Sequence, residues 1–193
     1  MNHLGTKRIE TDRLVLRRFT LEDARPMFEN WASDPEVTKY LTWPTHDKVE
    51  VSAWVLEDWI SHYGEAYYYQ WAIVPKDNAD KPIGSISVVR QNNKVESMEI
   101  GYCIGKAWWH NGIMTEALKA VMAYLFEEVG ANRICAVHDP NNPHSGGVMR
   151  KCGMTYEGTT RCSGWNNQGI CDESIYAILK EEYEVRKNAA DRV

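Results

Sequence analysis

Residues 98–118 read MEIGYCIGKAWWHNGIMTEAL, and this stretch decides the fold of the chain. Its first part, 98–104, is short, apolar and partly β-branched, which predicts a strand. Apolar residues then recur at helical spacing over 113–129, and Gly130 follows as a C-terminal stop. A tight turn at Gly112 joins the two segments. The stretch therefore predicts a strand, a glycine-containing turn and a long amphipathic helix.

The first turn of that helix is a candidate anion-binding site. Its backbone N–H groups have no intrahelical partner and the helix dipole is positive there, so a phosphate or diphosphate would bind well. Gly112 is a single glycine, unlike the three of a dinucleotide-binding fingerprint, and no Gly-Lys-Ser/Thr follows, which excludes a P-loop. From geometry alone, an ordinary strand-to-helix connection is an equal alternative.

Length and composition indicate one soluble globular domain. The chain has 193 residues, 44% hydrophobic and 25% charged, which is enough to bury a full core. No apolar run reaches about 18 residues and the N-terminus lacks the apolar core of a signal peptide, so we expect a cytoplasmic protein that does not span a membrane. A net charge of −5 argues against a nucleic-acid groove and suits a cationic acceptor.

The five cysteines form an odd number and include no Cys-x-x-Cys pair, so a metal site or a disulfide framework is not expected. Most of them lie in apolar strand patterns, where they would serve as small core residues. His138 and His144 lack further ligands at useful spacing, and we expect no metal there.

Helices alternate with strands along the rest of the chain, which predicts α/β or α+β layering. Thr20 and Asp23 resemble a capping box at the start of a helix. We expect strands at 8–19, 67–74, 82–90, 95–104, 133–138, 154–163 and 170–179, and helices at 21–31, 36–40, 48–63, 113–129 and 145–152. A single domain is expected over 8–180, followed by a charged tail at 181–193.

Five segments, in order, resemble the GNAT N-acetyltransferases, and most closely their RimJ/RimL-type branch. The central one is EIGY at 99–102 with WWHNGIMTEA at 108–117, similar to the acetyl-CoA motif. The other four are ETDRLVLR at 10–17, PIGSI at 82–86, NPHS at 142–145 and KCGMTYEG at 151–158. The resemblance covers roughly residues 8–180. It implies a mixed, splayed central sheet of about seven strands flanked by helices, and a monomer or homodimer.

The resemblance implies acetyl-CoA as co-substrate and no metal. The superfamily pattern Gln/Arg-x-x-Gly-x-Gly/Ala is altered here: Trp109 and Met114 occupy its ends, and His110 and Asn111 replace a more usual glycine and basic residue. Backbone groups would therefore do most of the diphosphate binding. The expected cofactor-binding residues are Ile100, Tyr102, Ile104, Trp109, His110, Asn111, Gly112, Ile113, Met114, Thr115, Asn142 and Ser145.

Acetyl transfer to an amine needs a base, because an alkyl amine of pKa about 10 is mostly protonated at neutral pH. The candidate is Glu99, on the strand that should run beside the thioester, with Glu96 and His138 as lesser candidates. Alternatively, Glu99 is an ordinary polar member of an alternating strand. The resemblance implies that the strand opens around 100–102, where Gly101 would permit distortion and free N–H groups could bind the thioester carbonyl.

Ser145 is the candidate donor to the leaving thiol, with Asn142 holding the pantetheine arm. Ser145 would also suit the N-cap of the helix predicted after it, and the two roles are compatible.

The acceptor pocket is expected to use aromatic side chains, because the chain holds eight Trp and ten Tyr. The expected acceptor-binding residues are Tyr40, Trp43, Trp71, Glu99 and Trp165. The competing interpretation is that most of these aromatics belong to the core or its rim.

The leading hypothesis is therefore direct attack of a primary amine on acetyl-CoA in a ternary complex. The amine would be a protein N-terminal α-amine or a small molecule. One alternative is a GNAT-fold module that binds acyl-CoA without turnover. The other is a cysteine relay through Cys103 or Cys152.

Overall fold

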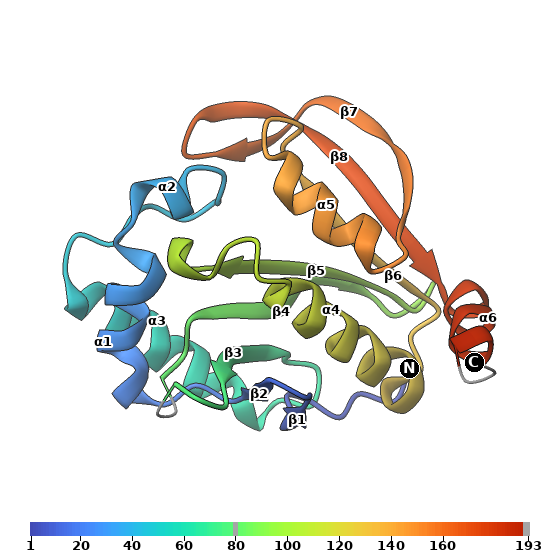
Figure 1. The fold of residues 1–193 in the computed structure, drawn as a ribbon, viewed down its shortest axis with the longest axis horizontal. Helices are drawn as coiled ribbons and strands as arrows, with labels where there is room; N and C mark the ends of the chain where they lie inside the picture. The colour runs from blue at the N-terminus through green and yellow to red at the C-terminus, as the bar shows by residue number, and fades with distance from the viewer. Residues whose placement is uncertain (79–80, 191–193) are drawn as a thin grey trace.

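The computed structural model describes residues 1–78 and 81–190, which form a mixed sheet with helices on both faces (Figure 1). The strand order is β1-β2-β3-β4-β5-β6-β8-β7. The strands are β1 Ile9–Glu10, β2 Leu14–Arg17, β3 Gln70–Pro75, β4 Gly84–Asn92, β5 Ser97–Ile104, β6 Arg133–His138, β7 Thr155–Asn166 and β8 Gly169–Leu179. All neighbours are antiparallel except β5 and β6, which run parallel. The predicted α/β fold with a mixed central sheet is confirmed.

Six α-helices accompany this sheet in the described residues. They are α1 Ala24–Met27, α2 Pro35–Thr38, α3 Val49–Ser61, α4 Ile113–Tyr124, α5 Pro143–Lys151 and α6 Lys180–Ala190. Wider π-type turns extend α1 to Ala32 and α4 to Val129, so both regions are helical over nearly their predicted lengths. The backbone N–H of Thr20 donates to the Asp23 carboxylate at 2.8 Å, as the predicted capping box requires.

The first predicted strand, 8–19, is wrong in one respect, because it divides into β1 and β2. The Thr11 N–H donates to the Leu14 carbonyl at 3.0 Å, and the Thr11 hydroxyl accepts the Leu14 N–H at 2.9 Å. These bonds reverse the chain, so that Ile9 pairs with Leu16. The sheet therefore gains an eighth strand.

Strand alternation divides the apolar side chains between two cores. Trp71, Ile86 and Ile100 face α4, together with its Leu118 and Val121. On the opposite face of the sheet, Ala72 and Val74 pack with Trp31 and Leu56 of the N-terminal helices. Figure 1 shows α4 and α5 together on one face of the sheet, and α1 and α3 together at the left of the view.

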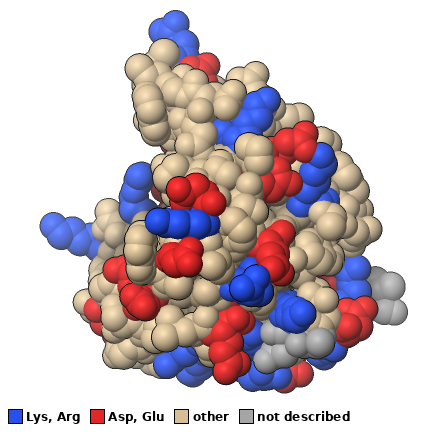
Figure 2. Space-filling model, turned by 90° about the vertical axis from the view of Figure 1, so that its left-hand side faces the viewer, with Lys and Arg blue, Asp and Glu red and all other residues tan. Residues whose placement is uncertain are grey.

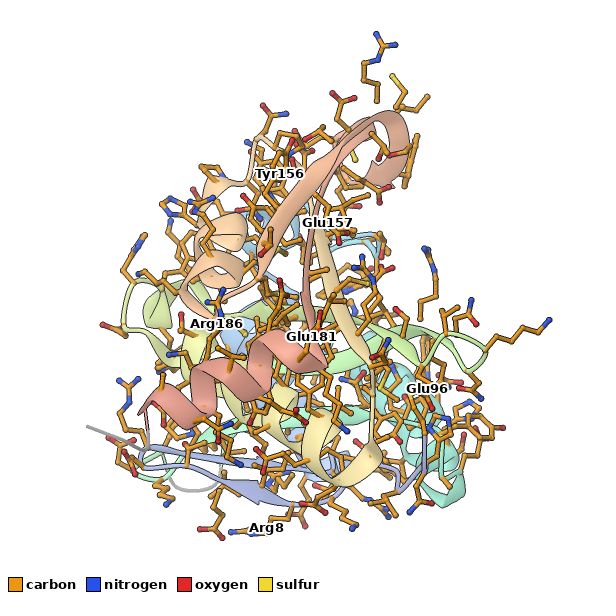
Figure 3. All side chains as sticks on the ribbon, turned by 90° about the vertical axis from the view of Figure 1, so that its right-hand side faces the viewer. Arg8, Glu96, Tyr156, Glu157, Glu181 and Arg186 are labelled. Atoms are coloured by element: carbon orange, nitrogen blue, oxygen red, sulfur yellow. The ribbon has the colours of Figure 1, made fainter. Side chains whose placement is uncertain are left out.

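The packed region extends past both limits of the expected 8–180 domain. Tyr183 of α6 stacks on Phe126 with ring centroids 4.8 Å apart, and Lys187 pairs with Glu127 at 2.7 Å. Arg186 reaches back from α6 so that its guanidinium lies against Gly153, just after α5 (Figure 3). At the other end, Leu4 packs on the core and Thr6 is buried.

Charged side chains of both signs are interspersed on the side of the molecule shown in Figure 2. No helix within the described residues is both long enough and apolar enough for a membrane span.

Candidate active site

The parallel strands β5 and β6 separate after three residues. Their register covers only Ser97–Glu99 against Arg133–Cys135. Beyond that point β6 remains paired with β8 as far as His138, whereas β5 continues with β4 alone as far as Ile104. The sheet therefore opens from Ile100 onward, as the resemblance implied.

A β-bulge in β4 accompanies this opening. The register between β4 and β5 shifts between Val88 and Arg90, directly opposite Ile100 and Glu99. The extra residue, Val89, places a methyl carbon 2.7 Å from where a Cβ at position 101 would lie, so a side chain there would clash unless Val89 moved. The bulge thus lies in β4, and Gly101 accommodates it from the neighbouring strand.

The opening leads into a cavity of about 360 Å³ between the carboxyl end of β5 and the first turns of α4 and α5. Ten of the twelve expected cofactor-binding residues line it: Tyr102, Ile104, Trp109, His110, Gly112, Ile113, Met114, Thr115, Asn142 and Ser145. Two do not. Ile100 is 2% exposed and belongs to the core under α4, and the carbonyl of Asn111 instead accepts a bond from Arg13 outside the cavity.

The N-terminus of α4 opens into this cavity without a side-chain cap. Gly112 occupies the N-cap position in the left-handed region, with φ 74°, so no side chain can accept from the N–H groups of the first turn. His110, two residues earlier, also has positive φ, 63°, which is unfavourable for a residue with a side chain. These conformations turn the chain sharply at the start of α4, where Gly112, Ile113, Met114 and Thr115 line the cavity.

An imidazole pair links the two helix starts. The rings of His110 and His144 meet edge to face, with centroids 4.8 Å apart, and both residues line the cavity. His144 was not among the expected cofactor-binding residues, because its contact with His110 joins segments more than 30 residues apart.

Tyr102 and Ser145 form a second link across the opening. The Tyr102 hydroxyl lies 3.1 Å from the Ser145 hydroxyl and donates to the Ser145 carbonyl at 3.0 Å. Burial raises the pKa of Tyr102, which keeps the phenol protonated and able to donate. The two hydroxyl groups therefore connect β5 to α5 beside the predicted position of the thiol.

The predicted N-cap role of Ser145 is wrong. Helix α5 begins at Pro143, two residues earlier than expected, with Asn142 at its N-cap position. Proline is favoured at the first position of a helix because its fixed φ is helical and its missing N–H is not needed there. Ser145 lies inside the first turn, so its hydroxyl is available to Tyr102.

Glu99 lies where β5 and β6 part, but it does not line the cavity. Its neighbours Met98 and Ile100 are buried under α4, so strand alternation places Glu99 on the opposite face of the sheet. Its side chain is 14% exposed and lies 3.4 Å from Arg90. Burial raises the pKa of Glu99, Arg90 lowers it, and nearby Glu173 raises it further; the net direction is upward.

The expected acceptor-binding residues divide in the structure. Tyr40 lines the cavity, together with Val37 and Leu41. The prediction that Trp71 binds the acceptor is wrong, because its side chain is fully buried under α4. Its ring N–H donates to the Lys7 carbonyl at 2.6 Å. Trp43 packs in the second core beside His46, and Trp165 is 63% exposed on the β7–β8 hairpin; neither lines the cavity.

The tip of the β7–β8 hairpin is fastened to the segment that carries Tyr40. The Asn167 side chain donates to the carbonyls of Thr38 and Trp43, each at 2.8 Å, and its backbone N–H donates to the Leu41 carbonyl at 3.2 Å. Next to it, buried Asn166 donates to Asp139 at 2.8 Å. Figure 1 shows the hairpin arching over the sheet to reach α2.

The lesser base candidates lie elsewhere. Glu96 binds the amino group of Met1 at 2.9 Å. His138 packs against Gly146 beneath α5 and does not line the cavity, and its Nδ1 lies 2.8 Å from the Asp139 carbonyl.

The cysteines are all unpaired thiols. Cys103 lines the cavity and Cys152 is buried beside the Thr115 carbonyl. Burial raises the pKa of Cys103, and it raises that of Cys152 to about 12, so neither favours the thiolate that a relay needs. Among the described residues, no three His, Cys, Asp or Glu side chains gather as a metal site would require.

Residues 13–155 match the Acetyltransferase (GNAT) domain family. The N-acetyltransferase YoaA of Bacillus subtilis is 32% identical over 172 residues, which are 89% of this chain and 96% of YoaA. The ribosomal protein uS5-alanine N-acetyltransferase of Escherichia coli is 30% identical over 162 residues, 78% of this chain and 79% of that protein.

A crystal structure of a GNAT-family acetyltransferase from Bacillus anthracis superposes with a TM-score of 0.79 at 26% identity, covering 91% of this chain and 99% of that one. The family match spans the opened strands, the uncapped α4 and the Tyr102–Ser145 contact. The chain therefore belongs to the GNAT acetyltransferase family and is an N-acetyltransferase of the RimJ/RimL-like branch.

Proposed function

We propose that this enzyme transfers the acetyl group of acetyl-CoA directly to a primary amine, with Glu99 as the base and Ser145 as the donor to the leaving thiol. One observation carries the proposal: the opening between β5 and β6 and the uncapped N-terminus of α4 meet in a single cavity. An unpaired strand edge suits an extended pantetheine arm, and free helix N–H groups suit its diphosphate.

The two faces of the sheet give the reactants separate approaches. The cavity extends from the first turns of α4 and α5 to Val37, Tyr40 and Leu41, whereas Glu99 lies outside it, on the face away from α4 and beside the start of the opening. An amine that binds near Glu99 would reach the thioester through the gap between the strands. Separate approaches favour direct attack in a ternary complex over a covalent acyl-enzyme.

The proposed residues, together with solvent, take up and supply the protons of this reaction. Glu99 removes a proton from the ammonium form, directly or through a water, and its raised pKa brings its basicity closer to neutral pH. The amine nitrogen then forms a bond to the acetyl carbonyl carbon, and backbone N–H groups of the open β5 edge stabilise the oxyanion. The nitrogen then loses its second proton to Glu99, which passes each proton to solvent. As the C–S bond breaks, the Ser145 hydroxyl, oriented by its contact with Tyr102, donates a proton to the sulfur and regains one from solvent.

The acceptor is proposed to be a protein N-terminal α-amine or a small amine. Similarity to the uS5-alanine N-acetyltransferase supports the first class. The Asn167 side-chain bonds to the Thr38 and Trp43 carbonyls hold the segment that carries Tyr40, a cavity residue that would contact either kind of acceptor.

The test is release of free thiol from acetyl-CoA in the presence of an amine panel. The panel should contain peptides with N-terminal alanine or serine, the same peptides with a blocked N-terminus, and small mono- and diamines. Turnover with at least one free amine, and none with the blocked peptides, is expected. Tight binding of acetyl-CoA with no thiol release on any amine would instead indicate a binding module.

A further inference from the structure

We propose that Arg13 is a positioning residue for acetyl-CoA, one that orients the diphosphate-binding turn from outside the cavity. The inference rests on the proposed function, because it concerns how the turn 109–112 binds the diphosphate. Arg13 belongs to the segment 10–17 that resembles the opening strand of the family, and nothing so far gives that segment a part in the reaction.

Arg13 bridges the turn and the helix that follows it. Its Nη1 donates to the Asn111 carbonyl at 3.0 Å, and its Nε donates to the Glu116 carboxylate at 2.6 Å. Asn111 comes just before the N-cap glycine, and the N–H of Glu116 makes the first helical bond, 3.1 Å to the Gly112 carbonyl. One guanidinium therefore holds both ends of the first turn of α4.

The bond to Asn111 fixes the direction of the next N–H group. In a planar trans peptide the C=O and N–H point in opposite directions. Gly112 lines the cavity and Arg13 does not. With the Asn111 carbonyl held toward Arg13, the N–H of Gly112 is directed to the cavity side. Because Gly112 has φ 74° and an unrestricted backbone, this peptide would otherwise rotate easily.

Glu116 is itself held firmly, so it provides a fixed anchor. Its carboxylate accepts from the Thr11 hydroxyl at 2.5 Å and from the backbone N–H of Arg13 at 3.1 Å, besides the guanidinium. Burial would raise the pKa of Glu116, but the bonds from Thr11 and Arg13 outweigh it and lower the pKa, so the group is ionised at neutral pH.

The Arg13–Glu116 ion pair also reduces the repulsion between Glu116 and a bound diphosphate. A carboxylate in the first turn of a helix interacts favourably with the helix dipole, but it would repel a diphosphate bound at the same helix end. The Arg13 guanidinium neutralises it, and its Nη2 lies 3.7 Å from where a Cβ at Gly112 would be. Arg13 is 53% exposed, and such an ion pair adds little to global stability, which leaves local orientation as its main effect.

The experiment compares CoA with pantetheine, which has the same thiol arm but no diphosphate. Calorimetry gives the Kd for CoA, and S-acetylpantetheine gives kcat/KM without the diphosphate. In Arg13→Ala we expect CoA to bind about 10- to 100-fold more weakly, as for loss of a charge-assisted hydrogen bond, and kcat/KM for S-acetylpantetheine to stay within about twofold. Arg8→Ala is the matched control, because Arg8 is an exposed arginine paired with Glu10.

Two further variants separate orientation from charge. Arg13→Lys keeps the cation but lacks the planar fork that reaches two acceptors, so we expect an intermediate loss of CoA affinity. Arg13→Ala combined with Glu116→Gln removes the unpaired charge and should recover only part of the CoA affinity, because the orientation of the turn is still lost. Full recovery of CoA affinity in the double variant, equal losses with both ligands, or no loss in Arg13→Ala would each overturn the proposal. Absence of CoA binding in the unmodified enzyme would instead overturn the proposed function.

Discussion

At the scale of single residues, the proposed chemistry depends on a few polar groups in unlike surroundings. Glu99 is a carboxyl largely removed from water at the point where two strands part. Tyr102 and Ser145 are hydroxyls that contact one another across the opening. A base with a raised pKa and a neutral donor on the other face of the sheet are what proton removal from an amine and proton delivery to a thiolate need.

Replacing Glu99 with Gln should lower kcat/KM by about 100-fold or more, because the base is lost while the shape is kept. The unmodified enzyme needs Glu99 ionised, so its activity should rise with pH through a midpoint above the ordinary 4.5, since the pKa is raised. That acidic limb should vanish in the variant. Glu157→Gln, which alters a partly exposed carboxylate paired with Arg133, is the control for charge. Unchanged turnover of Glu99→Gln at every pH would exclude this base.

Ser145→Ala and Tyr102→Phe should each lower kcat by about 10- to 100-fold, because each interrupts proton delivery to the leaving sulfur. Since the two hydroxyls act as one unit, the double variant should be little slower than either single variant. Steady-state rates of the four enzymes give the comparison. Losses that multiply in the double variant would contradict a shared role of the two hydroxyls, and a lower melting temperature with unchanged rates would indicate a packing role.

At the scale of secondary-structure elements, two local features, a β-bulge and a turn, shape the site. One is the bulge in β4, which coincides with the end of the β5–β6 pairing. The other is the β7–β8 turn, where Asn166 and Asn167 fasten the hairpin to Asp139 and to the chain around Leu41. Through these hydrogen bonds, the β7–β8 turn holds the segment that carries Tyr40 in place at the cavity.

Asn167→Ala should release that segment, because two side-chain bonds to backbone carbonyls are lost. We expect faster amide hydrogen exchange in residues 38–43, a loss of about 1–3 kcal/mol of local stability, and a higher KM for the acceptor with little change in that for acetyl-CoA. Gln168→Ala is the matched control, since the Gln168 side chain bonds only its neighbour's carbonyl. Amide hydrogen exchange in residues 38–43 that equals that of Gln168→Ala would refute the role of Asn167 in holding this segment.

At the scale of the whole molecule, the cavity is assembled from three separate regions of the chain. Its walls come from the segment after α2, the connection from β5 to α4, and the start of α5. A ligand that contacts all three should stabilise the fold as a unit.

CoA at about 100 times its Kd should therefore add about 2.7 kcal/mol to the free energy of unfolding. For a chain of this size that corresponds to a rise in Tm of about 5–10 °C, measurable by calorimetry. Adenosine, which lacks the diphosphate and the pantetheine arm, should produce little shift. No shift at saturating CoA would contradict binding in this cavity.

Local sequence signals were sufficient for most elements and for much of the cofactor site. The 113–129 apolar period, Gly112 and Gly130 gave α4 with nearly its observed limits, because helical periodicity and glycine conformations depend on near neighbours. The start of α5 was also locally encoded by Pro143, although it was placed two residues late. Trp71 could not be assigned correctly, because burial of an aromatic residue depends on which face of the sheet α4 covers.

By itself, the sequence determined the order of most strands and helices, the glycine turn at the start of α4 and the family, since all of these follow from patterns a few residues to a few turns long. Only the tertiary structure decided that β6 leaves β5 for β8, that Tyr102 meets Ser145, that Asn167 holds the chain around Leu41, and that Arg13 reaches Asn111. Each of these contacts joins residues 36 or more positions apart. Such pairs form only when the whole sheet is assembled, and spacing along the chain carries no information about them.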